Sequence, residues 1–219
     1  MTALPGTTRR DRGQWPLVTL ALAAIAAVVA AAPALQPLLL GAREEIAAGQ
    51  VWRLLTAHVV HNSASHFAWD LAAFVLLGAL CERAGRARFA CCLGASAVLI
   101  PAAIGLWQPS LSSYCGLSGI DSALFVLCVA GVVRRAVAAR KPGLAAAAGL
   151  LAAGFVAKIG YEYATASTVF VADDGVPVPL AHVIGAFVGL AFGVVPRFGD
   201  VLDERPRRGA CAAASANGS

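Results

Sequence analysis

The chain has 219 residues, of which 59% are apolar and only 13% are charged, and its mean hydropathy is +0.74. Soluble domains contain roughly 45–50% apolar and about 25% charged residues, so a cytosolic globular domain is excluded. The apolar residues suffice for about six membrane helices of about 20 residues each. The formal charge of +5 could suggest a nucleic-acid partner, but the charges lie in short clusters between apolar runs, as in a membrane protein.

The first apolar run follows three arginines near the N-terminus. Residues 13–42 carry no charge, and the apolar core of this run, 17–40, is longer than the apolar region of a signal peptide. We therefore expect an uncleaved first membrane helix rather than a signal peptide. Residues 1–15 are expected to form a cytoplasmic segment before it.

Five further helices are predicted downstream. The second follows a mixed segment over 43–65 and extends to Cys81. The third and fourth share the uncharged stretch 89–120, which a Trp-Gln-Pro-Ser sequence at 107–110 interrupts, so the fourth begins near Gly116. The fifth runs over 143–163 and the sixth over 180–196, while the Ala/Ser/Gly-rich tail at 197–219 is expected to be disordered. The sequence thus predicts one all-α integral membrane domain of six transmembrane helices over 16–196.

The positions of the basic residues predict the orientation of these helices. Fourteen of the 17 Lys and Arg residues lie in the N-terminal segment, in the turns at 82–88 and 134–141, and in the tail. Cytoplasmic loops of membrane proteins carry an excess of Lys and Arg. Both termini are therefore predicted to be cytoplasmic. The loops at 41–65, 107–116 and 164–180 then face outward, toward the periplasm if the protein resides in a bacterial inner membrane.

Four polar residues lie near the outward-facing ends of the second, fourth and sixth predicted helices: His66, Asp70, Ser118 and His182. Polar residues are costly inside a membrane, so each is a candidate functional residue. Their convergence at one depth is a stronger indication of a site than any one of them.

Ser118 lies in the sequence Gly116-Leu117-Ser118-Gly119 at the start of the fourth helix. Glycines allow close approach of the backbone, and a helix N-terminus offers free N–H groups to a developing negative charge. The pattern favours a nucleophile beside an oxyanion site. A serine in a packing patch of small residues is the alternative interpretation.

His182 opens a helix on which Gly185, Gly189 and Gly193 recur every four residues. Such a face lets two membrane helices pack backbone to backbone, and the fourth helix is the expected neighbour. His182 is expected on the same side as Gly185, where it and a serine would form a nucleophile–base pair. An interfacial histidine bonded to a carbonyl oxygen is the alternative.

His66 and Asp70 lie four residues apart and share a face of the second helix. A histidine can donate a hydrogen bond to an oxyanion. An ionised aspartate only accepts hydrogen bonds, so a buried Asp70 could donate only if protonated, or it could orient a histidine. A capping or polar-packing aspartate is the alternative.

His58, His61 and His66 could suggest a metal site. The His-Glu-x-x-His signature of zinc proteases is absent, and no carboxylate follows at the spacing that would provide a base. We therefore predict neither a metal nor another cofactor.

Lys158 and Glu162 are a second pair of polar residues at helical spacing, at the outward end of the fifth helix. Side chains four residues apart are neighbours on a helix surface. We expect a structural ion pair.

Together these residues resemble the rhomboid family of intramembrane serine proteases. The resemblance covers about 45–195 and rests on four motifs in register: Trp52-Arg53, His66 four residues before Asp70, Gly116-Leu117-Ser118-Gly119, and Ala181-His182-Val183-Ile184-Gly185 through Gly189. The compact chain is similar to the rhombosortase branch in particular. That branch is associated with processing proteins that carry a C-terminal Gly-Gly motif, a membrane helix and a basic end.

The resemblance implies that Ser118 is the nucleophile and His182 the general base, in a dyad without a third carboxylate. It also implies that His66 and the backbone N–H of Ser118 form the oxyanion hole. One departure from the family pattern is Asp70, which replaces the usual asparagine.

A second departure is Ser122, four positions after Ser118, where the family commonly has an aromatic residue that stacks on the catalytic histidine. The stacking interaction is therefore missing here. Asp121 or Ser122 could compensate by forming a hydrogen bond to His182.

The leading hypothesis is an intramembrane serine endopeptidase that cleaves membrane-anchored proteins near the outer membrane face and removes a Gly-Gly type sorting anchor. A general rhomboid protease of single-span proteins is the alternative within this class. The second hypothesis, from another class, is a rhomboid-like protein that binds clients without cleaving them, and Asp70 and Ser122 are the residues that favour it. A transporter or channel is a third class, but the polar residues cluster near one face instead of crossing the bilayer. The expected partners are substrate proteins and lipid, not nucleic acid, and the sequence does not indicate an oligomeric state.

Overall fold

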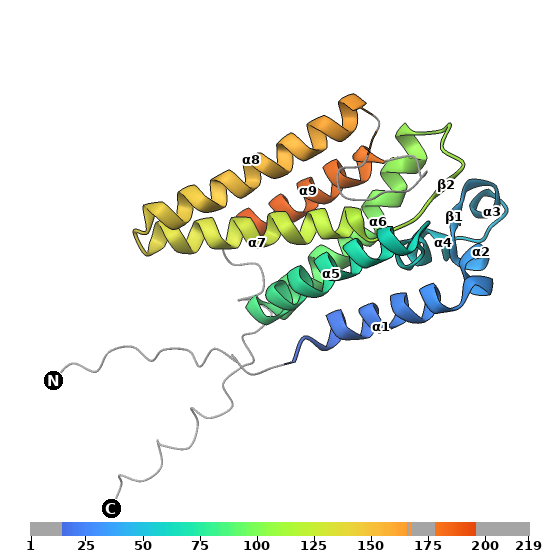
Figure 1. Cartoon of the computed structure of the whole chain (residues 1–219), viewed down its shortest axis with the longest axis horizontal. Helices are drawn as coiled ribbons and strands as arrows, with labels where there is room; N and C mark the ends of the chain where they lie inside the picture. Colours follow the sequence, from blue (N-terminus) through green and yellow to red (C-terminus); the bar gives the residue numbers. More distant parts are fainter. Residues whose placement is uncertain (1–14, 166, 168–177, 196–219) are drawn as a thin grey trace, which may run out of the picture.

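The computed structural model describes residues 15–165, 167 and 178–195 and is built almost entirely of helices (Figure 1). Its long helices are α1 (Leu17–Ala31), α5 (Ala64–Ala84), α6 (Arg86–Trp107), α7 (Ser118–Ala138), α8 (Pro142–Thr165) and α9 (Pro179–Val194). Between α1 and α5 lie the short elements η1 (Pro33–Leu35), α2 (Gln36–Leu39), β1 (Gly41–Ala42), α3 (Arg43–Ala47), α4 (Arg53–Thr56) and η2 (Ala57–Val59). Strand β2 (Ser113–Tyr114) precedes α7 and pairs antiparallel with β1, with Gly41 opposite Tyr114. The all-α class predicted from the sequence is confirmed.

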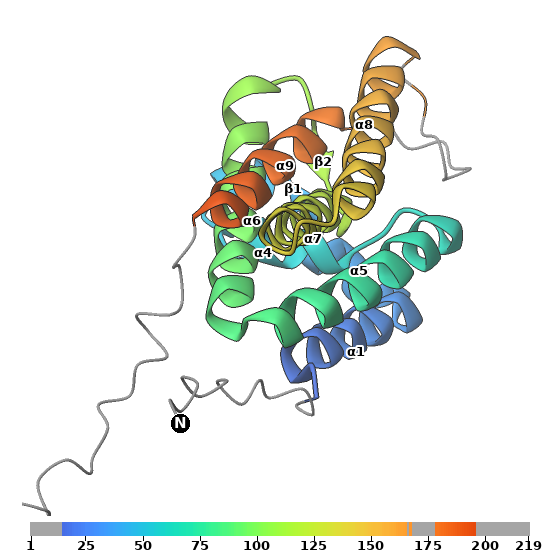
Figure 2. The same ribbon diagram turned by 90° about the vertical axis from the view of Figure 1, so that its left-hand side faces the viewer.

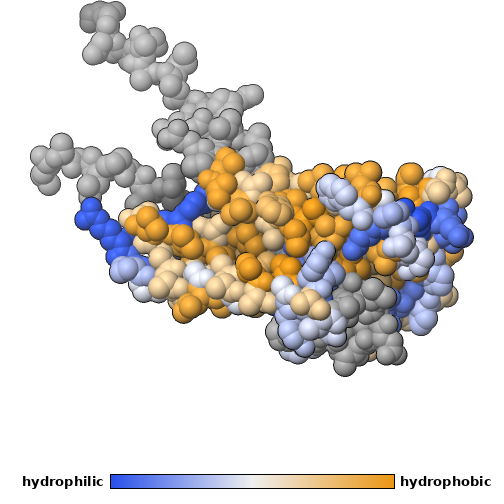
Figure 3. Space-filling view, turned by 90° about the horizontal axis from the view of Figure 1, so that it is seen from above, coloured by the Kyte–Doolittle hydropathy of each residue, from blue (hydrophilic) through white to orange (hydrophobic). Residues whose placement is uncertain are grey.

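Helices α5, α6 and α8 are each long and apolar enough to cross a membrane. Within the described ranges, α1 and the segment Pro33–Leu39 would be a fourth span if the bent pair is counted as one, and α9 is a shorter apolar helix. Figure 3 shows one face of the molecule, where apolar side chains cover the middle and polar ones gather toward the two ends. The chain is therefore an integral membrane protein, whereas the number of six spans stays a prediction.

The structure corrects the extent of the first helix. The apolar run 17–40 does not form one continuous helix, because α1 ends at Ala31 and the chain bends by 97° into Pro33–Leu39. A proline disfavours the α conformation in the residue before it, and Ala32 accordingly has φ −121° and ψ 78°. Pro33 therefore ends the first helix.

Helix α7 lies at the centre of the bundle and contacts α5, α6, α8 and α9 (Figure 2). Its most extensive contact is with α9, and small residues explain the close approach. A methyl group added at Gly185 would collide with the carbonyl oxygen of Gly119, and one at Gly189 would collide with that of Ala123. At Gly193, an added Cβ would lie 2.6 Å from Cβ of Ala130.

A buried carboxylate joins α1 to α5. Glu82, near the end of α5, accepts hydrogen bonds from the backbone N–H groups of Val18 (3.1 Å) and Thr19 (2.9 Å) and from the Thr19 hydroxyl (2.8 Å). The first N–H groups of a helix have no partner within the helix, so Glu82 caps α1. Gly78, one turn earlier, leaves room for Thr19, whose Cγ2 would lie 2.8 Å from a Cβ at position 78.

Consecutive long helices run in opposite directions (Figure 1). The starts of α5, α7 and α9 and the end of α8 therefore lie at one end of the bundle, beside the short elements and the β1–β2 pair. Basic residues gather at the opposite end, around the turns that join α5 to α6 and α7 to α8: Arg83, Arg86, Arg134, Arg135, Arg140 and Lys141.

Candidate active site

Ser118 is the first residue of α7, and its side chain is partly exposed. The turn before it depends on Gly116, whose φ of +109° is a conformation that L side chains rarely adopt. A Cβ at position 116 would also lie 2.9 Å from Nε2 of His66. The turn thus places the Ser118 hydroxyl beside the first N–H groups of α7, which have no partner within the helix.

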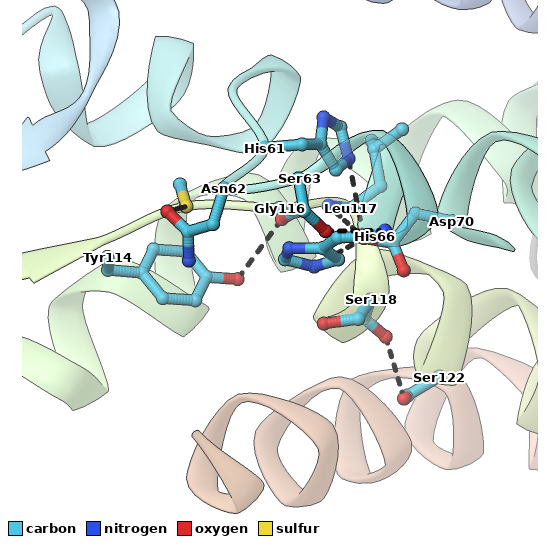
Figure 4. A network of polar contacts seen from close by, with 11 residues as sticks. His61, Asn62, Ser63, His66, Asp70, Tyr114, Gly116, Leu117, Ser118 and Ser122 are labelled. Carbon is cyan, nitrogen blue, oxygen red and sulfur yellow. Dashed lines mark hydrogen bonds and ion pairs between the residues drawn. The ribbon is translucent and has the colours of Figure 1, made fainter. Parts of the chain in front are cut away.

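One carboxylate oxygen, Oδ2 of Asp70, holds this turn (Figure 4). It accepts a hydrogen bond from the backbone N–H of Leu117 at 3.0 Å, and it lies 3.2 Å from Nε2 of His66 and 3.4 Å from Nε2 of His61. Asp70 itself is buried. Because a carboxylate accepts hydrogen bonds, Asp70 fixes the residue that precedes Ser118, and it contacts both imidazole rings.

His66 lies in the first turn of α5, where the Ser63 hydroxyl caps the helix by accepting a hydrogen bond from the His66 backbone N–H at 3.1 Å. The ring of His66 contacts Asp70 through Nε2. The nitrogen closest to the turn before Ser118 is therefore already engaged by a carboxylate, which the expected role as an oxyanion donor did not include.

His61 was considered from the sequence only as a metal ligand with His58 and His66. In the structure it contacts Asp70 and packs edge-on against the ring of His66, with 5.1 Å between the ring centroids. His58 points elsewhere and donates from Nε2 to the carbonyl oxygen of Ala97 at 3.1 Å. In the part of the chain that the structure describes, no group of three or more His, Cys, Asp or Glu residues could hold a metal ion.

His182 lies in the first turn of α9 and is buried. Its Nδ1 is 3.1 Å from Oε2 of Glu162, a side chain in the last turn of α8 that is only 2% exposed. The ammonium group of Lys158 lies 2.8 Å from both carboxylate oxygens of Glu162. The expected ion pair between Lys158 and Glu162 is therefore present.

The contact between Glu162 and His182 is what sequence reasoning missed. An ion-paired carboxylate can only accept a hydrogen bond, so Nδ1 of His182 donates to Glu162. The neutral ring then keeps its lone pair on Nε2. The only signal in the sequence was the presence of a second carboxylate at the predicted outward end of a helix.

The packing of α7 on α9 brings the residues next to Ser118 and His182 into contact. Gly119, next to Ser118, lies against Ala181, next to His182: a Cβ at position 119 would be 3.1 Å from the carbonyl oxygen of Ala181. Over the described residues, no hydrogen bond joins the Ser118 hydroxyl to the His182 ring. Hydrogen bonds between reacting groups are often long without substrate and tighten only when it binds.

Neither residue expected to hold His182 in place of an aromatic ring does so by a hydrogen bond. The Ser122 hydroxyl donates to the backbone carbonyl oxygen of Ser118 at 2.8 Å (Figure 4). Asp121 is buried, and its two carboxylate oxygens have no hydrogen-bond partner among the residues that the structure covers. The hydrogen bond that His182 does make is to Glu162, through Nδ1.

Trp52 and Arg53 lie outside this cluster. The Arg53 guanidinium is buried and donates to the carbonyl oxygens of Pro37 and Leu40 at 2.7 and 2.8 Å. Trp52 is half exposed. The arginine therefore ties α4 to the segment that follows α1, and this pair contributes to the shape of the loop rather than to the cluster around Ser118.

A sequence model of the Rhomboid domain matches residues 48–197. The match covers more than half of the chain and includes the whole cluster described above. No curated protein matches the chain.

Proposed function

Because the chain belongs to the rhomboid family of intramembrane serine proteases, we propose that it is a serine endopeptidase that cleaves membrane-anchored proteins. In this proposal Ser118 is the nucleophile and His182 the general base. The observation that carries the proposal is the orientation of His182, whose Nδ1 faces Glu162 and whose Nε2 is left free to take a proton. The helix that bears His182 packs on the helix that begins at Ser118.

The proposed reaction follows from these positions. Nε2 of His182 takes the proton from the Ser118 hydroxyl as the oxygen attacks the carbonyl carbon of the substrate. The first N–H groups of α7, including that of Ser118, stabilise the oxyanion, and His66 joins them as a donor once its Nε2–H turns from Asp70 toward the substrate oxygen. The protonated His182 then gives its proton to the leaving amine, and a water molecule hydrolyses the acyl-enzyme by the same two steps.

The position of the site in the membrane supports a membrane-anchored substrate. Ser118 lies at the end of the bundle opposite the basic turns, and basic loops of membrane proteins face the cytoplasm. We therefore place the site at the outward side of a bacterial inner membrane, with both termini cytoplasmic. A substrate helix has to unwind there before cleavage, because its backbone groups are hydrogen-bonded to each other within the bilayer.

The proposal is tested by labelling the detergent-solubilised protein with a tagged fluorophosphonate, a reagent that reacts with activated serines. We expect labelling of the wild type and none of Ser118→Ala or His182→Ala. Ser122→Ala, which removes a hydroxyl one helical turn from Ser118, serves as the matched control and is expected to retain labelling. An unlabelled wild type with intact helicity would exclude the protease and favour a protein that binds clients without cleaving them.

The substrate class is proposed on a narrower basis. The chain resembles the rhombosortase branch of the family, so we propose that the substrate carries a C-terminal Gly-Gly motif followed by a membrane helix and a basic end. A reporter with this anchor is expected to be cleaved upon co-expression, and a reporter in which Ala-Ala replaces Gly-Gly is not. Equal cleavage of the two reporters would favour a general rhomboid protease of single-span proteins.

A further inference from the structure

Glu162 is a buried carboxylate that the proposed Ser118–His182 pair does not use. Its side chain is 2% exposed, although it lies on α8, a helix whose surface is otherwise mostly exposed. Burying a charge is costly unless it has partners. Glu162 contacts Lys158 on its own helix and His182 on the next one.

Lys158 neutralises the charge of Glu162, but it shares one carboxylate oxygen, Oε2, with His182. The ammonium group lies 2.8 Å from both Oε1 and Oε2, and Oε2 also accepts the hydrogen bond from Nδ1 of His182 at 3.1 Å. An ion pair within one helix needs no partner on α9. The hydrogen bond to His182 therefore has a consequence beyond the stability of α8.

We infer that Glu162 is a positioning residue for His182 and completes a Ser118–His182–Glu162 triad, an inference that rests on the proposed function. By accepting a hydrogen bond from the N–H at Nδ1, the carboxylate fixes the tautomer in which Nε2 is the base. When His182 takes the Ser118 proton at Nε2, the ring becomes a cation 3.1 Å from Glu162 and is stabilised there. The proton at Nδ1 stays on the ring throughout.

The other groups around His182 do not orient its ring, which makes the hydrogen bond to Glu162 more important. Among the described residues, no aromatic ring stacks on His182. Ser122 and Asp121 do not hold the ring by a hydrogen bond either. The other carboxylate of the site, Asp70, is engaged with Leu117 and two other histidines. Glu162 is therefore the group that sets the orientation of His182.

The inference is tested by the kinetics of fluorophosphonate labelling, which separate the affinity for the reagent from the maximal rate of reaction with Ser118. We expect Glu162→Ala to lower the maximal rate by at least about tenfold, with the apparent affinity changed by less than about twofold. Glu162→Gln keeps an oxygen that can accept from Nδ1 and is expected to react faster than Glu162→Ala. Lys158→Met removes the ion pair but keeps the hydrogen bond, and is expected to stay within about threefold of the wild type.

Each result separates the inference from the proposed function. Labelling of Glu162→Ala at the wild-type rate, while Ser118→Ala is unlabelled, would overturn the positioning role and leave the protease intact. An equal loss in Lys158→Met and Glu162→Ala would assign the effect to the ion pair and also overturn it. An unlabelled wild type would overturn both. If Glu162→Ala fails to fold, Glu162→Gln is compared with Lys158→Met. Glu162→Gln lacks the charge that stabilises the protonated His182 ring, so it is expected to react more slowly than Lys158→Met. A rate in Glu162→Gln no lower than that in Lys158→Met contradicts the inference.

Discussion

Oδ2 of Asp70 lies 3.0 Å from the backbone nitrogen of Leu117, the residue immediately before Ser118. This hydrogen bond connects the second turn of α5 to the start of α7 across 47 positions of the chain. Leu117 is buried, so its N–H group has no access to water as a replacement partner. Asp70 therefore stabilises the backbone on which the proposed nucleophile stands.

Asp70→Ala is expected to lower the free energy of unfolding by about 1–3 kcal/mol, because it leaves the N–H of Leu117 buried without an acceptor. Asp70→Asn keeps one oxygen that can accept this hydrogen bond, so we expect a smaller loss and faster labelling of Ser118 than in Asp70→Ala. Thermal unfolding in detergent and fluorophosphonate labelling measure the two effects. Equal losses in the two variants would show that the hydrogen bond to Leu117 does not matter.

Gly185→Ala is expected to separate α9 from α7, because the added methyl group collides with the carbonyl oxygen of Gly119. Overpacking of this kind costs about 1–3 kcal/mol, and it also moves His182 away from Ser118. We therefore expect a lower melting temperature together with a loss of labelling. Gly154→Ala on the exposed surface of α8, where an added Cβ meets no atom within 4 Å, is the matched control and is expected to keep the labelling and not to lower the melting temperature. The same response in both variants would contradict the explanation.

Glu82→Ala is expected to destabilise the attachment of α1 by about 1–3 kcal/mol, because the N–H groups of Val18 and Thr19 lose their acceptor. Since Glu82 lies at the opposite end of the bundle from Ser118, the labelling of the folded protein should stay unchanged. Glu44→Ala, at an exposed acidic side chain, provides the control for the loss of a charge. A melting temperature equal to that of the wild type would mean that this cap contributes nothing.

The burial of His58 is expected to make the stability of the fold depend on pH. Burial lowers the pKa of His58 below 6.5, although the hydrogen bond to the carbonyl oxygen of Ala97 opposes this shift. The unfolded chain therefore binds a proton at this position more readily than the folded protein. The contribution of neutral His58 to the free energy of unfolding is fully present above about pH 7. It is lost as the pH falls from 6.5 to the folded-state pKa, by at most about 1.4 kcal/mol per pH unit.

His58→Gln removes this titration and keeps a group that can donate to Ala97. The difference in melting temperature between wild type and His58→Gln should therefore be more favourable to the wild type at pH 7.5 than at pH 5.5. A difference that is constant over this range, or that grows in acid, would contradict the burial of a neutral ring.

Much of the fold follows from two features of the sequence, the lengths of the apolar runs and the breaks between them. The basic segment predicted as a turn at 134–141 marks the boundary between α7 and α8, although α7 continues through Arg134 and Arg135 to Ala138. The Trp-Gln-Pro-Ser break ends α6 at Trp107 as predicted. The predicted extent of the first helix was wrong because the apolar run continues through Pro33. Hydropathy alone does not show that a proline disfavours the helical conformation at the residue before it, Ala32. The short helices between α1 and α5 and the two-residue strands β1 and β2 have no periodicity long enough to predict them.

The site was predictable where its residues lie on one helix and not where it depends on contacts between helices. The spacing of His66 and Asp70 places them on one face of α5, and they do contact each other. Spacing could not reveal that Asp70 also accepts a hydrogen bond from Leu117, or that Glu162, besides pairing with Lys158, contacts a histidine 20 residues later. Such contacts depend on the relative positions of two packed helices, α5 and α7 in the first case and α8 and α9 in the second, and no local sequence pattern encodes these positions.

The shortness of α9 has a consequence for the lipid around it. Sixteen residues at about 1.5 Å each make a helix of about 24 Å, whereas the hydrocarbon layer of a bilayer is about 30 Å thick. If α9 crosses the membrane, the bilayer beside it can adapt to this mismatch by thinning locally. Thinning at the end of α9 that bears His182 would bring the headgroups closer to that residue, and a substrate segment that approaches along this helix would meet water sooner than in undisturbed membrane.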